Sequence, residues 1–460
     1  MRKIITLLIL FLVLFTVIDD KNIQGNEYSL KEEYYSINFK DKNEFDKQTK
    51  RLNIEVTYFI PEINTAQIKV NKKKLASLLK NDRSINYINP TCSTCVRTKT
   101  LNNTNRSVIN YEENLFNRQW DMKKVTNNGK SYALENKIKT AKVAVVDSGI
   151  NANHKDLTSI NKMINEVPKD GYRGSEKNET GEKKYIKDKL NHGTLVAGQI
   201  GASGRLKGIN PGVEMNIYRV FGSKKSDILW ISKGIIDAAN DNNDVINVSL
   251  GNYMIKQNNN EKRKLRLDEK VDYDALQNAI NYAFKKGSIV VAAVGNDGIN
   301  VNDSVQIQRQ RGLSPDSFSK VYDAPASMKN VLTIGSIDKR EKISEFSNWG
   351  NNFIDLTTIG GSYRLLDKYG EKDWLEKGYM QKETILSTSA NGRYVYQAGT
   401  SLAAPKVSGA LALVIDKYNL KNEPQKTLNI LQEKGIVEKS YMDFNHYGNG
   451  QLDVYSLLKG

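Results

Sequence analysis

The chain of 460 residues is too long for one average domain, so we expect two folded units and a large buried core. Its formal net charge of +16 comes from scattered lysines, and no basic run alternates with aromatic residues, which argues against a nucleic-acid-binding protein. The charge favours solubility and attraction to acidic surfaces. Cys92 and Cys95 form a single CxxC, which is weak evidence for a metal and favours a local disulfide or two loop thiols.

The N-terminus has the composition of an export signal. Arg2 and Lys3 precede an apolar run from Ile4 to Ile18, which is too short for a comfortable membrane span. We therefore assign residues 1–22 to a signal peptide and expect a secreted protein, extracellular or associated with the cell envelope, with no stable membrane span after signal removal. No clean small-x-small cleavage site follows, so an uncleaved N-terminal anchor remains the alternative.

Residues 23–90 alternate regularly between strand and helix patterns. Strands are expected at 33–40, 53–60, 65–70 and 85–90, and helices at 41–50 and 73–82. This β-α-β-β-α-β order predicts a small α+β domain. The polar segment 91–117, with three asparagines in LNNTN, is typical of a linker.

Residues 118–460 change to continuous apolar runs separated by helical patterns. The runs are rich in Val and Ile and do not alternate with polar residues, as expected for strands buried on both faces: KVAVVD, MNIYRVF, VINVSL, SIVVAAVG and VLTIGSI. Helices are expected between them, for example behind a candidate N-cap at Ser226 and before Gly287. The alternation predicts an α/β fold with a doubly wound, largely parallel sheet, in which sites form at the carboxyl ends of strands.

Three residues at such positions form a candidate site. Asp147 ends the strand KVAVVD, His192 precedes a helical run of small residues, and Ser401 lies at the start of a helix expected over 400–414. A serine hydroxyl is a poor nucleophile until a base takes its proton, which His192 can do. A buried Asp147 would hold the imidazole tautomer. On its own, Asp147 could equally be a turn or cap residue.

Other residues support this choice. The remaining histidines, His154 and His446, lie in polar segments and are expected to be structural or at the surface. Asn296 ends another buried strand just past Gly295, and its amide could donate to a developing oxyanion. Alone, this pair would be an ordinary Gly-Asn turn, but beside the three residues above it favours an acyl-transfer site.

Four motifs in one order, VVDSGI, NHGTLVAG, AAVGND and GTSLAAPKVSG, resemble the subtilisin-type serine proteases. The resemblance covers about residues 117–460, the expected catalytic domain 118–460. It implies a catalytic triad of Asp147, His192 and Ser401, with Asn296 in the oxyanion hole. It also implies that Ser249, Leu250 and Gly251 bind the substrate backbone as an added strand. The 23–90 domain then resembles the family's propeptide, which assists folding, inhibits and is removed, so the chain is expected to be a zymogen processed within 91–117.

The sequence departs from the usual pattern of that family at two places. Lys406 stands where these proteases usually carry a histidine. The loop GASGRLKGINPG is short and has no Asp or Glu, whereas many relatives wrap a calcium ion there. We expect no required cofactor and no metal site, and the sequence does not support a structural calcium ion.

Within that family the chain resembles the leader peptidases that mature lantibiotics such as nisin and epidermin. The segments that carry this resemblance are GNDG, DAPAS, ISEFSNWG and APKVSGALALVIDKYNLKN. The resemblance implies that Asp323 lies at the base of the P1 pocket and Asp297 at its rim, although each could be a solvated loop acid. Those peptidases cut after arginine. We therefore expect a monomeric peptidase that removes the leader of a lantibiotic precursor after an Arg residue.

Two other functions remain open from the sequence. A broad-specificity secreted subtilase acting on host or environmental proteins would use the same chemistry. A catalytically inactive subtilase fold could instead act as a binding module, although the intact set of Asp147, His192, Ser401 and Asn296 argues against it. Labelling of Ser401 by a fluorophosphonate would separate the enzymes from the binding module.

Overall fold

A computed structural model describes residues 31–81, 84–95, 114–223, 225–257, 268–315 and 319–459. The signal peptide expected over residues 1–22 lies outside them. The chain divides into two compact units, one ending at Thr91 and the other beginning at Cys92. Within the described ranges, no helix has the length and apolar character needed to cross a membrane.

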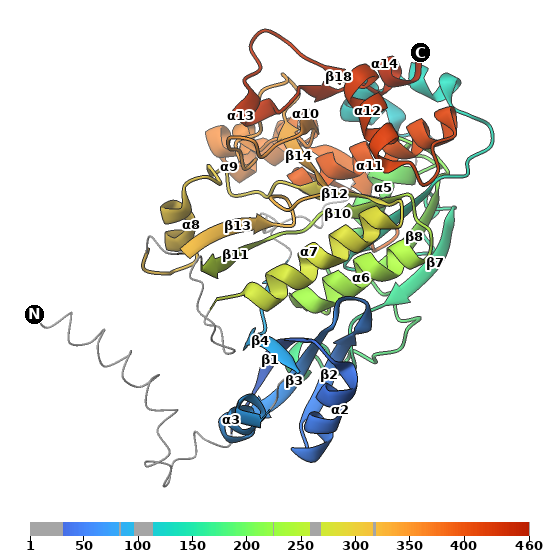
Figure 1. Cartoon of the computed structure of the whole chain (residues 1–460). Coiled ribbons are helices and arrows are strands. Elements are labelled where there is room, and N and C mark those ends of the chain that lie inside the picture. Colours follow the sequence, from blue (N-terminus) through green and yellow to red (C-terminus); the bar gives the residue numbers. More distant parts are fainter. Residues whose placement is uncertain are drawn as a thin grey trace, which may run out of the picture. The chain divides into compact units, whose positions relative to one another are not determined.

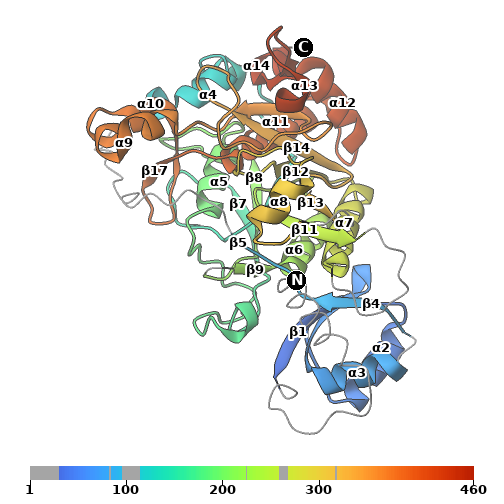
Figure 2. The same ribbon diagram turned by 90° about the vertical axis from the view of Figure 1, so that its left-hand side faces the viewer.

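The smaller unit has the predicted β-α-β-β-α-β order. Its antiparallel sheet has the strand order β2-β3-β1-β4. Alternate residues of β1, among them Ile37 and Phe39, pack with Phe45 and Leu78 of the two helices, so both helices cover one face of the sheet (Figure 2). The elements are β1 (Glu32–Phe39), α2 (Lys42–Arg51), β2 (Glu55–Ile60), η2 (Pro61–Ile63), β3 (Thr65–Asn71), α3 (Lys72–Asn81) and β4 (Ile85–Pro90).

The larger unit is built on a nine-stranded sheet in the order β18-β19-β15-β14-β12-β10-β6-β8-β7 (Figure 1). Its neighbouring strands are parallel except for β18 with β19, which confirms the largely parallel sheet predicted from the Val and Ile runs. The strands are β6 (Lys142–Asp147), β7 (Ile160–Asn165), β8 (Glu214–Arg219), β10 (Val245–Val248), β12 (Ile289–Ala293), β14 (Val331–Ile337), β15 (Leu356–Ile359), β18 (Ile436–Val437) and β19 (Gln451–Leu452).

Helices cover both faces of this sheet. Val143 and Val145 of β6 belong to the core shared with α5 (Gly193–Gly201) and α11 (Thr400–Tyr418). Val146, which points the other way, meets Gly234 of α6 (Ile228–Asn240), beside which α7 (Lys270–Lys285) packs (Figure 1). The sheet is therefore buried on both faces, as a doubly wound fold requires.

The remaining helices and small sheets surround this framework. Three two-stranded sheets pair β5 (Ser93–Cys95) with β9 (Lys225–Asp227), β11 (Asn252–Gln257) with β13 (Ser319–Ala324), and β16 (Ile385–Thr388) with β17 (Tyr394–Gln397). The other helices are η3 (Phe116–Arg118), α4 (Trp120–Val125), η4 (Lys130–Leu134), η5 (Tyr172–Gly174), α8 (Ser304–Gln310), α9 (Arg364–Glu376), α10 (Tyr379–Glu383), α12 (Pro424–Lys434), α13 (Phe444–Tyr447) and α14 (Val454–Lys459).

Strand β6 occupies the point at which the winding reverses. The chain places β8 and β7 on one side of β6 and β10, β12, β14 and β15 on the other. In open α/β sheets, ligands bind outside the carboxyl ends of the strands at such a point. Asp147 is the last residue of β6, so it lies where a site is expected.

One local expectation was wrong. Ser226 does not cap α6: it lies in the middle of β9, and Asp227 holds the N-cap position without a side-chain capping bond. The pairing of β9 with β5 draws Ser226 into a strand. Of the two alternatives left open for the cysteines, the local disulfide is excluded, because Cys92 is a buried free thiol.

Candidate active site

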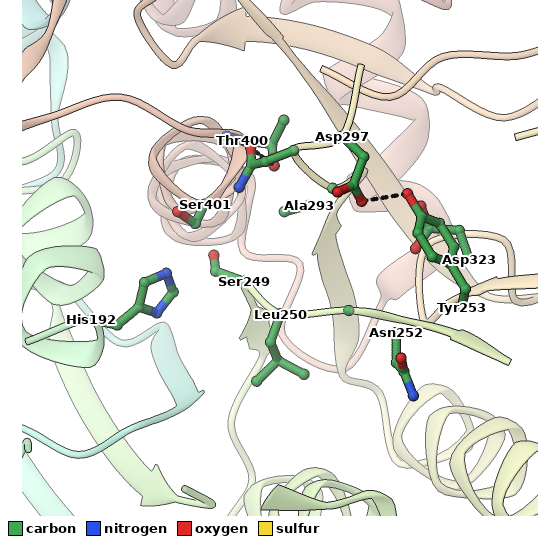
Figure 3. Close-up of a pocket in the computed structure, with 13 residues that line it drawn as sticks. His192, Ser249, Leu250, Asn252, Tyr253, Ala293, Asp297, Asp323, Thr400 and Ser401 are labelled. Carbon is green, nitrogen blue, oxygen red and sulfur yellow. Dashed lines mark hydrogen bonds between the residues drawn. The ribbon is translucent and has the colours of Figure 1, made fainter. Parts of the chain in front are cut away.

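The sheet and two helices bring the predicted acid, base and serine together. His192 holds the N-cap position of α5, and its Nδ1 lies 2.7 Å from Oδ1 of Asp147 at the end of β6. Ser401 lies in the first turn of α11 and lines the same cavity as His192 (Figure 3). Because Nδ1 faces the carboxylate, Nε2 is the ring nitrogen left to accept a hydrogen bond from the Ser401 hydroxyl. A hydrogen bond between a base and a nucleophile often becomes short only when substrate binds.

The surroundings of His192 set the pKa of its imidazole. Burial lowers the pKa of the imidazole, but the charge and hydrogen bond of Asp147, together with the charge of Asp188, raise the pKa above its ordinary value overall. The imidazolium is the form that arises when histidine accepts the serine proton, so this environment favours the proton transfer. Asp188 itself accepts hydrogen bonds from Ser148 and from Thr194 in the first turn of α5, which hold its carboxylate at the start of that helix.

Hydrogen bonds from Thr400 orient the side-chain amide of Asn296. Its Oδ1 accepts bonds from the backbone N–H of Thr400 at 2.8 Å and from the Thr400 hydroxyl at 2.9 Å. A Cβ atom placed on Gly399 would lie 3.2 Å from Ser401 Oγ and 3.6 Å from Asn296 Nδ2. The hydroxyl and the amide nitrogen therefore flank one small space, which a side chain at position 399 would fill. This space is why a glycine precedes the Thr-Ser pair.

Lys406, which departs from the pattern that the sequence resemblance implies, is fully buried in α11. Its ammonium donates to Gln199 Oε1 of α5 at 2.7 Å and to the Leu402 carbonyl at 3.1 Å, and it lies 3.1 Å from the carboxylate of Asp121 in α4. Burial lowers the pKa of Lys406 and the Asp121 carboxylate opposes that shift. One lysine thus joins three helices, two of which carry His192 and Ser401.

The segment from Ser249 to Gly251 lines the same cavity, and side-chain hydrogen bonds join its C-terminal end to strand β5. Thr94 of β5 donates its hydroxyl to the Gly251 carbonyl at 2.9 Å, and Asn252 donates to the Ser93 carbonyl at 3.1 Å. On its other side β5 pairs antiparallel with β9. Strand β5, which belongs to the expected linker, therefore lies between β9 and the Gly251–Asn252 end of the segment that lines the cavity. This position is called the peptide track below.

Both predicted pocket acids line the cavity. Asp323 is 4% exposed, and its Oδ2 accepts a bond from Asn348 Nδ2 at 2.9 Å. Asp297 Oδ2 accepts a bond from the Tyr253 hydroxyl at 2.6 Å, which the dashed line in Figure 3 marks. Asn348 also donates to the Tyr253 hydroxyl at 2.8 Å, so a neutral Tyr-Asn pair links the two carboxylates. A cationic side chain entering this cavity would meet both acids.

Sequence reasoning did not single out Tyr253 or Asn348. Asn348 lies within the ISEFSNWG segment, but its side chain meets Asp323 only because β13 and the loop after β14 fold together. Tyr253 pairs directly opposite Asp323 between β11 and β13. Burial first, and then the charges of Asp323 and Asp297, raise the pKa of Tyr253 well above its ordinary value, so it stays a hydrogen-bond donor.

Hydrogen bonds within the protein hold two other features noted in the sequence, His154 and the loop GASGRLKGINPG. His154 is buried, with its ring nitrogens 3.0 Å from the Arg393 carbonyl and 3.2 Å from the Asp156 N–H, which suits the structural role expected for it. In the loop without acidic residues, the backbone N–H groups of Arg205 and Leu206 donate to the Asp156 carboxylate. Hydrogen bonds to a neighbouring side chain thus hold this loop.

Comparison with known proteins agrees with this geometry. Residues 139–450 match the Subtilase family and residues 30–92 match the protease propeptides/inhibitors. The chain is 63% identical over 458 residues to the epidermin leader peptide-processing serine protease EpiP of Staphylococcus epidermidis, covering 98% of this chain and 99% of that protein. It is 41% identical over 360 residues to the nisin leader peptide-processing serine protease NisP of Lactococcus lactis subsp. lactis, covering 77% of this chain but only 50% of NisP.

The crystal structure of EpiP from Staphylococcus aureus superposes with a TM-score of 0.87 at 48% identity, covering 93% of this chain and 98% of that one. Sequence, fold and the grouping of acid, imidazole, serine and amide around one cavity therefore lead to one assignment. The chain belongs to the subtilase family of serine proteases and is close to the proteases that process epidermin and nisin leaders.

Proposed function

We propose that this protein is a secreted serine endopeptidase that removes the leader of a lantibiotic precursor by cutting after an arginine. The observation that carries the proposal is the pair of carboxylates, Asp297 and Asp323, in the cavity that Ser401 also lines. A guanidinium is costly to desolvate without a charge partner, and a carboxylate can accept two of its hydrogen bonds. The names of the relatives EpiP and NisP support the choice of a lantibiotic leader as the substrate.

The proposed reaction uses the side chains described above. Ser401 Oγ attacks the carbonyl carbon after the P1 residue while His192 Nε2 takes the hydroxyl proton. Asp147 holds the tautomer that presents Nε2 and stabilises the imidazolium. Asn296 Nδ2 and the backbone N–H of Ser401 donate to the oxyanion. The imidazolium then gives its proton to the leaving amine, and water, deprotonated by His192, releases the acyl group from Ser401.

The position of strand β5 supports the proposed binding position of the substrate. Ser93 meets Asn252 and Thr94 meets Gly251, so each step forward along β5 is a step back toward Ser249. Continued one for one, this register would put the residue two positions beyond Thr94 opposite Ser249. The next residue would then lie just past Ser249, at the cavity near Ser401, at roughly 3.3 Å per residue. By this count, position 97 of the chain would reach the cavity.

The same count supports a zymogen that cuts itself. Arg97 lies three residues beyond Thr94 and is basic, as is Arg106 further on; both lie outside the described residues. We propose that the domain at residues 23–90 is a propeptide and that cleavage after Arg97 releases the mature enzyme. The match of residues 30–92 to protease propeptides/inhibitors supports this reading.

The decisive experiment compares a modified lantibiotic precursor with a panel of denatured proteins, each incubated with the purified enzyme. Mass spectrometry should find one cut in the precursor, after the arginine that ends its leader, and little cleavage of the panel. A variant precursor with glutamine in place of that arginine should resist cleavage. General digestion of the panel, with no preference for arginine, would instead favour the broad-specificity subtilase.

A further inference from the structure

A second cavity, of about 610 Å³, lies beside strand β9 and apart from the candidate active site. Three lysines line it, Lys177, Lys189 and Lys225, together with a single carboxylate, that of Glu176. Lys177 and Lys225 are exposed, so a ligand can reach them from solvent. The ammonium of Lys177 also lies 3.7 Å from the Asp170 carboxylate, so Lys225 is the lysine on which the argument rests. The mechanism proposed above uses none of these residues.

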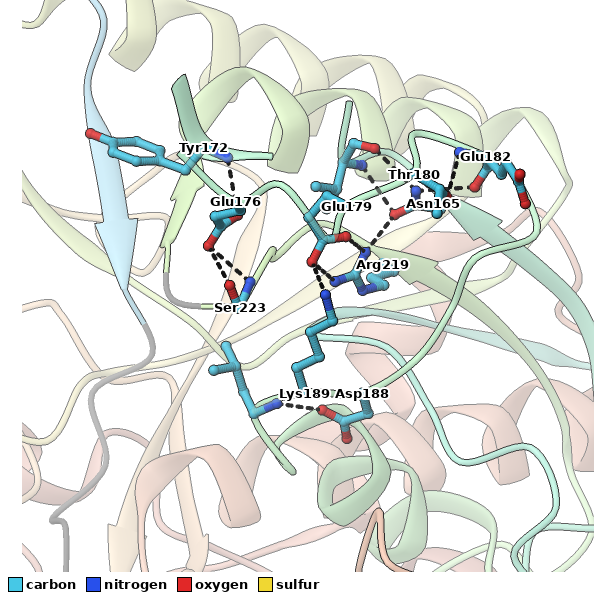
Figure 4. Close-up of polar contacts among 12 residues, drawn as sticks. Asn165, Tyr172, Glu176, Glu179, Thr180, Glu182, Asp188, Lys189, Arg219 and Ser223 are labelled. Carbon is cyan, nitrogen blue, oxygen red and sulfur yellow. Dashed lines mark hydrogen bonds and ion pairs between the residues drawn. The ribbon is translucent and has the colours of Figure 1, made fainter. Parts of the chain in front are cut away.

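The wall of this cavity is built on a buried ionic network (Figure 4). The guanidinium of Arg219, which is fully buried in β8, donates to both oxygens of Glu179 at 2.8 and 2.9 Å. Lys189 donates to the same carboxylate at 2.7 Å. Two cations therefore share one anion, which leaves this part of the wall with a net positive charge. Burial makes the network rigid, because breaking it would strand charges away from water.

The carboxylate of Glu176 accepts hydrogen bonds that join Tyr172 to Ser223. Its Oε1 accepts bonds from the backbone N–H and the hydroxyl of Ser223, both at 2.9 Å, and its Oε2 accepts the Tyr172 N–H at 3.0 Å (Figure 4). The ammonium of Lys225 lies 5.2 Å from the centre of the Tyr172 ring, a cation–π distance. The cavity thus offers fixed positive charge, and its one carboxylate is already satisfied.

Two contacts connect this cavity to the peptide track. Tyr172, which lines the cavity, donates its hydroxyl to Ser93 Oγ of β5 at 3.1 Å. Lys225, which also lines it, pairs in register with Cys95. Side chains two residues apart on a strand share a face. A peptide lying along β9 as β5 does would therefore direct every second side chain toward the lysines.

We infer that this basic groove is a specificity subsite that binds an acidic side chain of the substrate, at the peptide position that pairs with Lys225 and, more weakly, two positions before it. The numbering of these positions rests on the proposed function: if the cut follows Arg97, they are the third and fifth residues before the scissile bond. The occupant is a glutamate or aspartate of the peptide, which would approach Lys225 and Lys177 from solvent.

The test moves one glutamate through the five positions before the arginine of an otherwise alanine-based peptide, with glutamine at the same position as the reference. We expect kcat/KM to be about two- to fivefold higher for glutamate at the third position, less at the fifth, with no gain at the second and fourth, because exposed ion pairs are individually weak. The gain should lie in KM and should fall as salt is added. An equal gain at all positions, or no gain at any, would overturn the inference.

Variants locate the effect. Lys225→Gln should bring the glutamate-to-glutamine ratio close to one, and Lys225→Glu should reverse it and favour a lysine at the third position. Lys155→Gln, which removes an exposed charge from the same unit, is the control and should leave the ratio unchanged. A loss of the ratio in Lys155→Gln equal to that in Lys225→Gln would mean a diffuse charge effect and no subsite. Exchanging the arginine for leucine in the same peptides tests the proposed function separately.

Discussion

Replacing Asp323 with asparagine removes one charge from the active-site cavity while preserving the size of the side chain. Asp323 is 4% exposed, its Oδ2 is held by Asn348, and its Oδ1 would lie 3.4 Å from a Cβ built on Gly251, which lines the same cavity. An incoming guanidinium would therefore meet a fixed carboxylate with little water around it. A hydrogen bond to a charged group contributes about 1.5–3 kcal/mol. Since each 1.4 kcal/mol is about tenfold, kcat/KM for an arginine peptide should fall roughly ten- to a hundredfold.

The assay measures kcat/KM for matched peptides whose P1 residue is arginine, citrulline, lysine or leucine. Citrulline keeps the shape of arginine and loses the charge, so the wild type should show a large arginine-to-citrulline ratio that Asp323→Asn reduces. The leucine peptide should change little. Asp297→Asn should act in the same direction, more weakly and with more dependence on salt, because Asp297 is only partly buried.

The control is Asp373→Asn, which removes a partly exposed carboxylate, paired with Lys377, from α9. If Asp323→Asn leaves the arginine-to-citrulline ratio as it is in the wild type, Asp323 does not contact the P1 side chain. The reasoning from the two carboxylates to arginine would then be wrong, even if the enzyme still prefers arginine for another reason.

Four further predictions concern catalysis, maturation and stability. Ser401→Ala should lower kcat by about 10⁶-fold, the loss measured for the corresponding serine of subtilisin, and should leave the chain at full length on a gel. Arg97→Gln should prevent the cut after position 97 in an otherwise active enzyme. N-terminal sequencing of both forms would check this, and a wild-type N-terminus at another position would contradict cleavage after Arg97. The raised pKa of His192 means that protonation of the base begins at a higher pH, so the acidic limb of the kcat/KM profile should fall above the pH of an ordinary imidazole; a limb at or below it would contradict the assignment. Lys406→Met should lower the free energy of unfolding in urea by about 3–5 kcal/mol, because it leaves Asp121 buried and unpaired, and Lys406→Met combined with Asp121→Leu should recover much of that loss.

The framework of the site was predictable because its signals are local. A run such as KVAVVD needs no partner to indicate a strand buried on both faces, and the structure places it as β6, ending at Asp147. The helix begun by Thr400 was also expected, although it runs on to Tyr418 and holds Pro405 in its second turn. His192 at the start of α5 followed from the small residues after it. Motif order along the chain then identified the fold.

The features that depend on distant pairing could not be predicted. Ser226 has the local pattern of a helix cap, and only the approach of β5, more than a hundred residues earlier, makes it part of a strand. The Tyr253–Asn348 link between the pocket acids needs β11, β13 and a later loop to meet. Lys406 stood out as an unusual residue, but nothing near it in the sequence indicates that its partner is Asp121 in α4.

The ion pair between Lys406 and Asp121 sets a limit on how far the N-terminus can be trimmed. Asp121 is the second residue of α4, which begins at Trp120, only a few residues past the segment in which we expect maturation to occur. A cut anywhere before α4 leaves the carboxylate in place. Digestion that proceeds beyond it would strand an ammonium group inside the helix that carries Ser401, with about the energetic cost of breaking a buried pair. Ragged processing upstream of Leu115, whose side chain is buried in the core, therefore keeps this pair and its surroundings intact, whereas over-digestion past α4 would destabilise the enzyme.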